Sequence, residues 1–108
     1  MKWYHNLYVG DSIADRVKQV KRKLNHHVWI ASIYVIAFAS NPKNLLDVIP
    51  CWELRQRAYL GKDLFIVGLA KGYKEALELV TRIVDETYQN TGNVDVRTYL
   101  LSERRKEA

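Results

Sequence analysis

Residues 63–101 have the sequence DLFIVGLAKGYKEALELVTRIVDETYQNTGNVDVRTYLL and predict most of the fold. An apolar run over residues 63–69 leads through a glycine-marked turn into a long amphipathic pattern over residues 73–90. Thr91-Gly92-Asn93 marks the end of this helix, and residues 94–100 then alternate between apolar and polar side chains. Such alternation is typical of a strand with one solvated face. We therefore interpret the stretch as strand, helix and strand, a βαβ unit.

Residues 1–39 follow the same order. Residues 3–9 alternate as a strand does, and Gly10 permits a sharp turn. Ile13, Val17, Val20 and Leu24 then fall on one stripe of a helix. Residues 28–39 are almost continuously apolar, β-branched or aromatic, which indicates a strand covered on both faces. The first 39 residues are thus predicted to form a second βαβ unit.

Residues 40–62 separate the two units and are predicted to be a helical insert, because long structureless loops are uncommon in small domains. Asn41 can cap a short helix with Pro42 at its first position, and Pro50 ends it. A second helical piece then extends to Gly61. Residues 102–108, SERRKEA, are predicted to be a frayed charged tail.

Two βαβ units in tandem predict an α+β fold in a single domain, residues 1–108. The expected architecture is a ferredoxin-like sandwich: a four-stranded sheet of order 4-1-3-2 with two long helices on one face. This order places the apolar second strand at an edge, where it would promote aggregation. Either the insert covers it, or a second subunit pairs with it, or the strand order differs. We expect a homodimer for this reason.

Composition and charge narrow the class of protein. The chain is 48% apolar and 27% charged, as expected for a globular protein rather than a disordered one. Its N-terminal residues lack the apolar core of a signal peptide, and no apolar run is long enough to span a bilayer. The single Cys51 cannot form an internal disulfide. We expect a cytoplasmic protein that does not associate with a membrane.

The chain has a formal net charge of +5, and its charged residues are distributed unevenly along the sequence. Residues 11–27 contain five Lys and Arg and two Asp, a net charge of +3. Residues 73–90 contain two basic and four acidic residues, a net charge of −2. Helices of opposite sign favour pairing with each other or docking of a second copy. Cations in the last turn of the first helix also interact favourably with the helix dipole, which explains them without a nucleic-acid partner.

The outward face of the predicted sheet is the first candidate site. It would present Tyr4, Tyr8, Arg97 and Tyr99, joined by Tyr34 and Phe65. Tyrosines beside an arginine can stack on bases, as in RNA-recognition sheets. The third strand, however, departs from the consensus of such modules, and a dimer or the insert could bury the same rings.

The insert is the second candidate, with Trp52, Arg55, Arg57 and Tyr59 near Cys51. Trp, Tyr and Arg are enriched at binding hot spots, although core cover for the second strand explains the aromatic residues as well.

The remaining motifs favour ordinary structure. The turns at Gly10 and at 67–72 lead into helix N-termini that could bind an anion with help from Lys71, but they lack a phosphate-binding fingerprint. His26 and His27 have no local third ligand, so we expect no metal site and no cofactor. Cys51, Glu53, Asp47 and Asp63 have no visible catalytic partner.

Three classes of function stay open. The sequence favours a small, non-catalytic dimeric interaction or regulatory domain. The first alternative is a nucleic-acid-binding module that uses the aromatic sheet face. The second is a small enzyme with its site between insert and sheet, for which no small-molecule ligand can be named.

Overall fold

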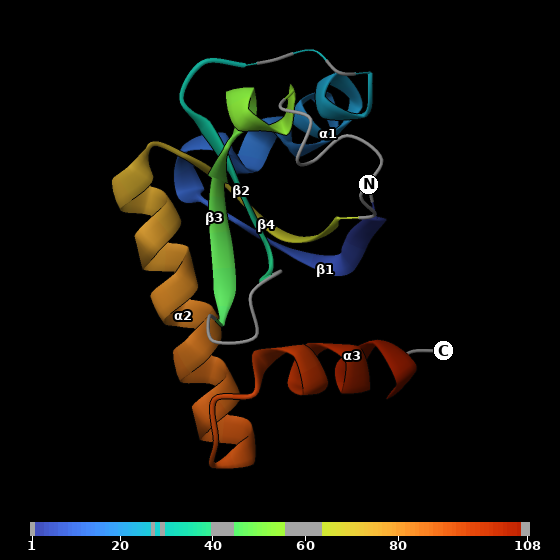
Figure 1. Ribbon diagram of the computed structural model, residues 1–108, viewed down its shortest axis with the longest axis vertical. Helices are drawn as coiled ribbons and strands as arrows, with labels where there is room; N and C mark the ends of the chain where they lie inside the picture. Colours follow the sequence, from blue (N-terminus) through green and yellow to red (C-terminus); the bar gives the residue numbers. More distant parts are fainter. Residues whose placement is uncertain (1, 27, 29, 40–44, 56–63, 107–108) are drawn as a thin grey trace.

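In the computed structural model, a four-stranded mixed sheet lies between helical layers (Figure 1). The structure describes residues 2–26, 28, 30–39, 45–55 and 64–106, with Arg55 and residues 103–106 described by their backbone only. The predicted α+β class with a four-stranded sheet is confirmed.

The strands are β1 (Lys2–Val9), β2 (Ile33–Phe38), β3 (Leu46–Pro50) and β4 (Phe65–Lys71). The α-helices are α1 (Val17–Asn25), α2 (Tyr73–Thr91) and α3 (Val96–Lys106). Two 3-10 helices complete the described elements, η1 (Asp11–Arg16) directly before α1 and η2 (Cys51–Arg55) directly after β3.

The sheet has the order β1-β4-β2-β3, which differs from the predicted 4-1-3-2. The neighbours β1, β4 and β2 correspond to the first, third and second predicted strands, but the additional strand β3 lies beside β2, so the ferredoxin-like order is not confirmed. Strand β1 pairs in parallel with β4, and β2 pairs antiparallel with both β4 and β3. Strands β1 and β2 therefore run in opposite directions, and the first predicted βαβ unit is wrong.

The predicted helical insert contributes the additional strand β3. Its residues 46–50 pair with β2 through five registered positions, from Phe38 with Leu46 to Tyr34 with Pro50. Val48 and Ile49 are β-branched, which favours a strand, and Pro50 is tolerated because β3 is an edge strand. The predicted helix between Pro42 and Pro50 is thus wrong where the structure describes it. Residues 40–44 and 56–62 lie outside the described residues.

Strand β2 is internal, with a neighbour on each side. Ile33, Val35 and Ala37 are buried on one face, and Ile36 is buried on the other. This agrees with the prediction of a strand covered on both faces. The edge exposure that suggested a homodimer through this strand is absent, because β3 occupies that edge.

The predicted last strand is the helix α3. Val96 and Leu100 are one helical turn apart and both are fully buried. Asp95 precedes the helix, and its carboxylate accepts hydrogen bonds from the backbone N–H and the hydroxyl of Thr98, the contacts of a helix N-cap. The helix continues to Lys106, through residues predicted to be a tail. The second predicted βαβ unit therefore ends in a helix.

The two long helices lie on opposite faces of the sheet. Val20 and Leu24 of α1 share a core cluster with Ile33, Val35 and Leu69. A second cluster, on the other face, contains residues of α2 and α3: Ala76, Leu79, Ile83, Val96 and Leu100. The prediction of both long helices on one face is thus wrong. The basic helix α1 and the acidic helix α2 are separated by the sheet and cannot pair with each other.

Candidate binding groove beside the edge strand

The predicted aromatic face exists, but it is buried. Tyr4 and Tyr8 share a cluster with Tyr34 and Phe65, as predicted, and their own rings stack with centroids 6.3 Å apart. Helices α2 and α3 cover this face, so Tyr4 is only 3% exposed and Tyr8 only 8%. Bases cannot stack on rings that the core already packs, so the aromatic face serves as core.

Arg97 and Tyr99 lie on α3 rather than on a strand. The Tyr99 ring packs against the cluster that contains Tyr4 and Tyr8. The Arg97 guanidinium lies 5.0 Å from the centroid of the Phe38 ring. The structure therefore brings these four predicted residues to one side of the sheet, as parts of the contact between α3 and the sheet.

Tyr8 has a polar partner beneath α2. Its hydroxyl donates a hydrogen bond of 3.0 Å to the Glu86 carboxylate, and the Arg82 guanidinium lies 5.6 Å from its ring centroid. Burial, followed by the hydrogen bond and the negative charge of Glu86, raises the pKa of the Tyr8 hydroxyl far above its ordinary value. Tyr8 therefore stays protonated and joins β1 to α2.

The insert exposes one of its predicted binding residues. Trp52 is 60% exposed and borders a recess of about 290 Å³ that Tyr34 and Pro50 also line. Cys51 beside it is buried, and burial raises the pKa of its thiol, so the thiolate needed for nucleophilic chemistry is disfavoured. Arg55 belongs to η2, and its side chain is not described. Arg57 and Tyr59 lie outside the described residues.

The glycine-marked turns bind a side-chain carboxylate of the protein itself, that of Glu75. The Glu75 carboxylate accepts a 2.9 Å hydrogen bond from the backbone N–H of Lys71 and 2.8 Å hydrogen bonds from the Ser12 hydroxyl. A Cβ at Gly10 would overlap this carboxylate, so only glycine permits its approach. Burial alone would raise the pKa of Glu75, but these hydrogen bonds outweigh it and lower the pKa. The interpretation as structural turns is thus supported.

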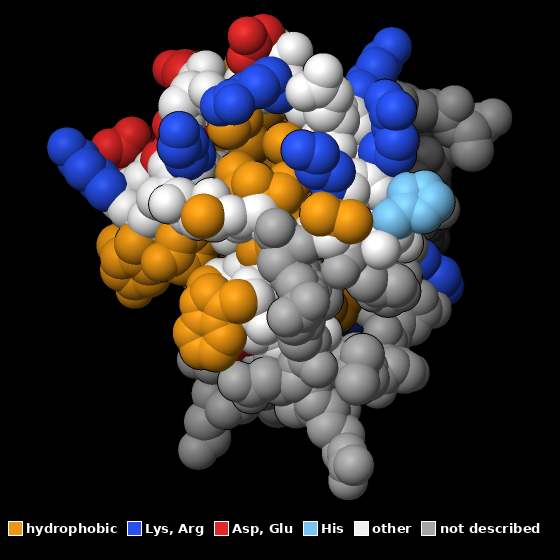
Figure 2. Space-filling model, turned by 90° about the horizontal axis from the view of Figure 1, so that it is seen from above, with side chains coloured by type: hydrophobic (Ala, Val, Ile, Leu, Met, Phe, Trp, Pro, Cys, Tyr) orange, Lys and Arg blue, Asp and Glu red, His pale blue; other side chains and the backbone are white. Residues whose placement is uncertain are grey.

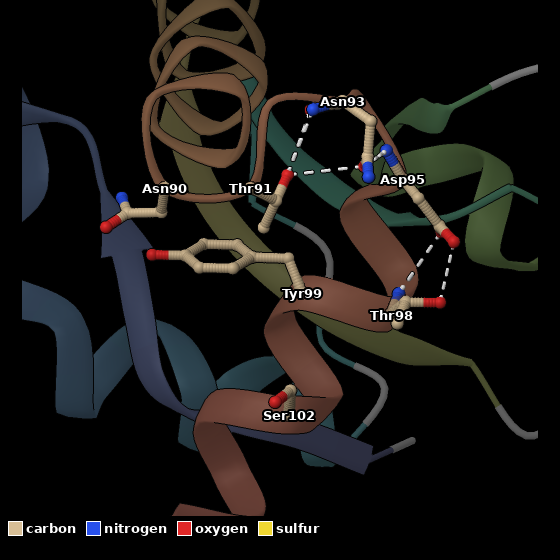
Figure 3. Close-up of a pocket in the computed structure, with 7 residues that line it drawn as sticks. All are labelled: Asn90, Thr91, Asn93, Asp95, Thr98, Tyr99 and Ser102. Carbon is tan, nitrogen blue, oxygen red and sulfur yellow. Dashed lines mark hydrogen bonds between the residues drawn. The ribbon is translucent and has the colours of Figure 1, made fainter.

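A polar recess of about 240 Å³ lies where α2 meets α3 (Figure 3). Its polar groups bond mainly to one another: Thr98 donates to Asp95 at 2.7 Å, and Thr91 donates to Asn93 at 3.2 Å. The hydrogen bonds from Thr98 lower the pKa of Asp95. These contacts hold the connection between the two helices, so they have a structural role.

A wide groove runs between β1 and the segment formed by η1 and α1. It has a volume of about 730 Å³. His5, Asn6, Leu7 and Val9 of β1 form one wall, and residues of η1 and α1 between Ala14 and Arg22 form the other. Strand β1 is an edge of the sheet, with β4 as its only neighbour among the described strands. The register between β1 and β4 is interrupted between Trp3 and Tyr8, beside the groove.

The groove is strongly basic. Arg16, Lys18, Lys21 and Arg22 line it, and Asp15 is its only carboxylate among the described residues. Asp15 lies 4.0 Å from the Arg16 guanidinium, so it offsets Arg16 rather than the lysines of α1. Figure 2 shows the end of the molecule that carries α1, where Lys and Arg side chains surround a hydrophobic patch and acidic side chains are fewer.

Lys21 is held at the wall of the groove by an aromatic contact. Its ammonium lies 5.2 Å from the centroid of the Trp3 ring, and the Trp3 indole N–H donates a 3.1 Å hydrogen bond to Asn25. A cation over an indole face is attracted by the ring quadrupole. The sequence had shown the positive charge of this helix, but the pairing of the helix with an edge strand became visible only in the fold.

The part of the chain that the structure describes contains no candidate metal site, because no three His, Cys, Asp or Glu side chains lie close enough together there to hold a metal ion. Within the same residues, no helix is both long enough and apolar enough to cross a bilayer.

No family model matches the sequence, and no characterised protein or solved structure was found to be similar to it.

Proposed function

We propose that the protein is a non-catalytic interaction domain whose groove between β1 and α1 binds an extended, acidic segment of a partner protein. The observation that carries this proposal is the combination of an edge strand with a wall of four cations that, among the described lining residues, one carboxylate offsets. A strand and a helix that border a groove form a recurrent receptor for extended peptides. The charge of the groove selects acidic residues and accelerates association.

The positions of the cations suit a chain that runs along the groove. Lys18, Lys21 and Arg22 are three and four residues apart on α1, so they project from one face of the helix. Lys18 and Arg22 are exposed to solvent, and Lys21 is half-buried against Trp3. Successive carboxylates of an extended partner can thus meet successive cations. A nucleic acid is less well suited, because the described residues that line the groove include no tyrosine, phenylalanine or tryptophan, and His5 supplies their single aromatic ring.

The test is titration of a fluorescently labelled peptide of alternating Glu and Val into the protein, followed by anisotropy. The double variant Lys18→Glu/Arg22→Glu should weaken binding by about tenfold or more, because each reversed charge removes an attraction and adds a repulsion. The matched control is Lys23→Glu, which reverses an exposed charge on the same helix outside the groove. It should change binding by less than about twofold.

Two outcomes would overturn the proposal. Equal weakening by Lys23→Glu would show attraction to net charge rather than binding in the groove. Tighter, groove-dependent binding of single-stranded RNA or DNA than of the acidic peptide would assign the groove to nucleic acid instead. A peptide of alternating Ser and Val is the uncharged control, and it should not bind to the groove.

A further inference from the structure

Helix α2 carries a second apolar stripe whose outer side no described element covers, although the Tyr73 ring contacts the Tyr34 ring of β2 with centroids 5.8 Å apart. Its buried stripe, formed by Ala76, Leu79, Ile83 and Thr87, packs on the sheet. Beside it lie five further residues, spaced by four, three, four and four: Tyr73, Leu77, Val80, Val84 and Tyr88. Tyr73 and Tyr88 are each 56% exposed and Leu77 is 42% exposed, whereas the two valines are half-buried at the border of the core.

This spacing keeps the five side chains on one face of α2 and permits packing against another helix. At 100° per residue the five side chains fall within a narrow sector of α2, adjacent to the buried stripe. Alternating steps of three and four form the seam through which paired helices interlock. The stripe, which we call the outer seam, extends over most of the 19 residues of α2. In Figure 1, α2 runs along one side of the molecule, with no other helix or strand beyond it.

We propose that the outer seam binds α2 of a second copy of this chain, antiparallel and about a two-fold axis near Val80 and Thr81. Positions at equal distances from this axis then meet across the interface. Tyr73 faces the second copy's Tyr88, and Leu77 faces the second copy's Val84. Val80 lies beside the axis and faces the second copy's Thr81. An interface of this kind is self-complementary, as two-fold symmetry requires.

The charges beside the outer seam fit the antiparallel direction. Lys74 and Asp85 are exposed and lie on the same flank of the seam. In the antiparallel pair, the Lys74 ammonium of each copy approaches the Asp85 carboxylate of the other, which gives two symmetric attractions. A parallel two-fold pair would instead put the flanks that carry Lys74 and Asp85 on opposite sides of the interface in the two copies, so neither attraction would form. The sequence therefore favours one direction of pairing.

The first test is the mass of the protein in solution, by sedimentation equilibrium over a range of concentrations. The unmodified protein should show twice the chain mass at micromolar concentration. Leu77→Glu places a charge in the middle of the outer seam and should raise the dissociation constant of the dimer by about tenfold or more. Val94→Glu is the matched control, because Val94 is also 42% exposed but lies between α2 and α3. It should leave the dimer intact.

The second test is a charge exchange, which separates this arrangement from other dimers. Lys74→Asp and Asp85→Lys should each weaken the dimer, and the double variant should recover most of the loss because the attraction is restored with reversed signs. Far-UV circular dichroism should show that all variants are folded, since both residues are exposed.

A monomeric unmodified protein at high micromolar concentration would overturn the proposal. It would also be overturned if Val94→Glu and Leu77→Glu raised the dissociation constant of the dimer equally. The same holds if the double charge variant lost as much dimer stability as the two single variants lose together. None of these results bears on the groove, which lies on the opposite face of the sheet and is tested with peptide.

Discussion

At the scale of single residues, Glu75 explains why two turns that could bind an external anion do not need one. Its carboxylate lies at the N-terminal end of α2, where a negative charge interacts favourably with the helix dipole. It also accepts hydrogen bonds from Ser12 in η1 and from Lys71 at the end of β4. One side chain thereby joins three elements that are distant in sequence.

Glu75→Gln should reduce the free energy of unfolding by about 1 kcal/mol at neutral pH, because charge-assisted hydrogen bonds become neutral ones. The hydrogen bonds lower the pKa of Glu75 in the folded protein. A lowered pKa stabilises the fold above the ordinary value of the carboxyl, about 4.3, and this stabilisation is lost as the pH falls through the lowered pKa. Urea unfolding at neutral pH and near pH 3 should therefore show a smaller difference at the lower pH.

Glu78→Gln serves as the control, since Glu78 is an exposed carboxylate on the same helix. It should unfold as the unmodified protein does at both pH values. A loss in Glu75→Gln that persists unchanged at low pH would contradict the ionic role of Glu75.

At the scale of elements, the sequence predicted correctly the helices and strands whose apolar residues recur with one clear period. The prediction was wrong where the apolar residues fit the periods of both a strand and a helix. Strand β4 and helix α2 were predicted nearly at their observed bounds, because the apolar run and the long amphipathic pattern each allow one interpretation. Residues 94–100 allow two interpretations, a strand and a helix. Val94, Val96, Thr98 and Leu100 alternate as in a strand, while Val96 and Leu100 are also one helical turn apart.

Two local signals could have corrected the prediction. Asp95 three residues before Thr98 is the spacing of a helix cap, and it would have favoured a helix over residues 96–106. Within the insert, Val48 and Ile49 are strand-favouring residues directly before Pro50, although the two prolines suggested a short helix. Which face of the sheet each helix covers was not accessible, because it depends on strand direction, and strand direction depends on pairings distant in sequence.

The helical nature of α3 can be tested by two matched substitutions. In a strand, Val94 and Leu100 would share one face and similar burial. In α3, Leu100 is fully buried, whereas Val94 is 42% exposed. Leu100→Ala should therefore cost about 2–5 kcal/mol of unfolding free energy in urea, and Val94→Ala should change it by less than about 0.5 kcal/mol. Similar losses for both would favour the strand.

At the scale of the whole molecule, the separation of α1 and α2 by the sheet gives the protein two independent surfaces. The basic groove belongs to one face, and the outer seam belongs to the helix that covers the other. A dimer formed through the outer seam therefore leaves both of its grooves open. If both proposals hold, the assembly is bivalent, and a partner that presents several acidic segments can occupy two grooves at once.

Bivalency predicts a difference that appears only on a crowded surface. On a sensor densely coated with the alternating Glu and Val peptide, the unmodified protein should dissociate about tenfold to a hundredfold more slowly than Leu77→Glu, because the second groove rebinds before the first releases. In solution, where each peptide occupies one groove, both proteins should bind with the same affinity. A sparsely coated sensor is the internal control and should abolish the difference. A slow dissociation that Leu77→Glu shares on the dense surface would mean that a single groove accounts for binding, and the dimer would then have no part in partner recognition.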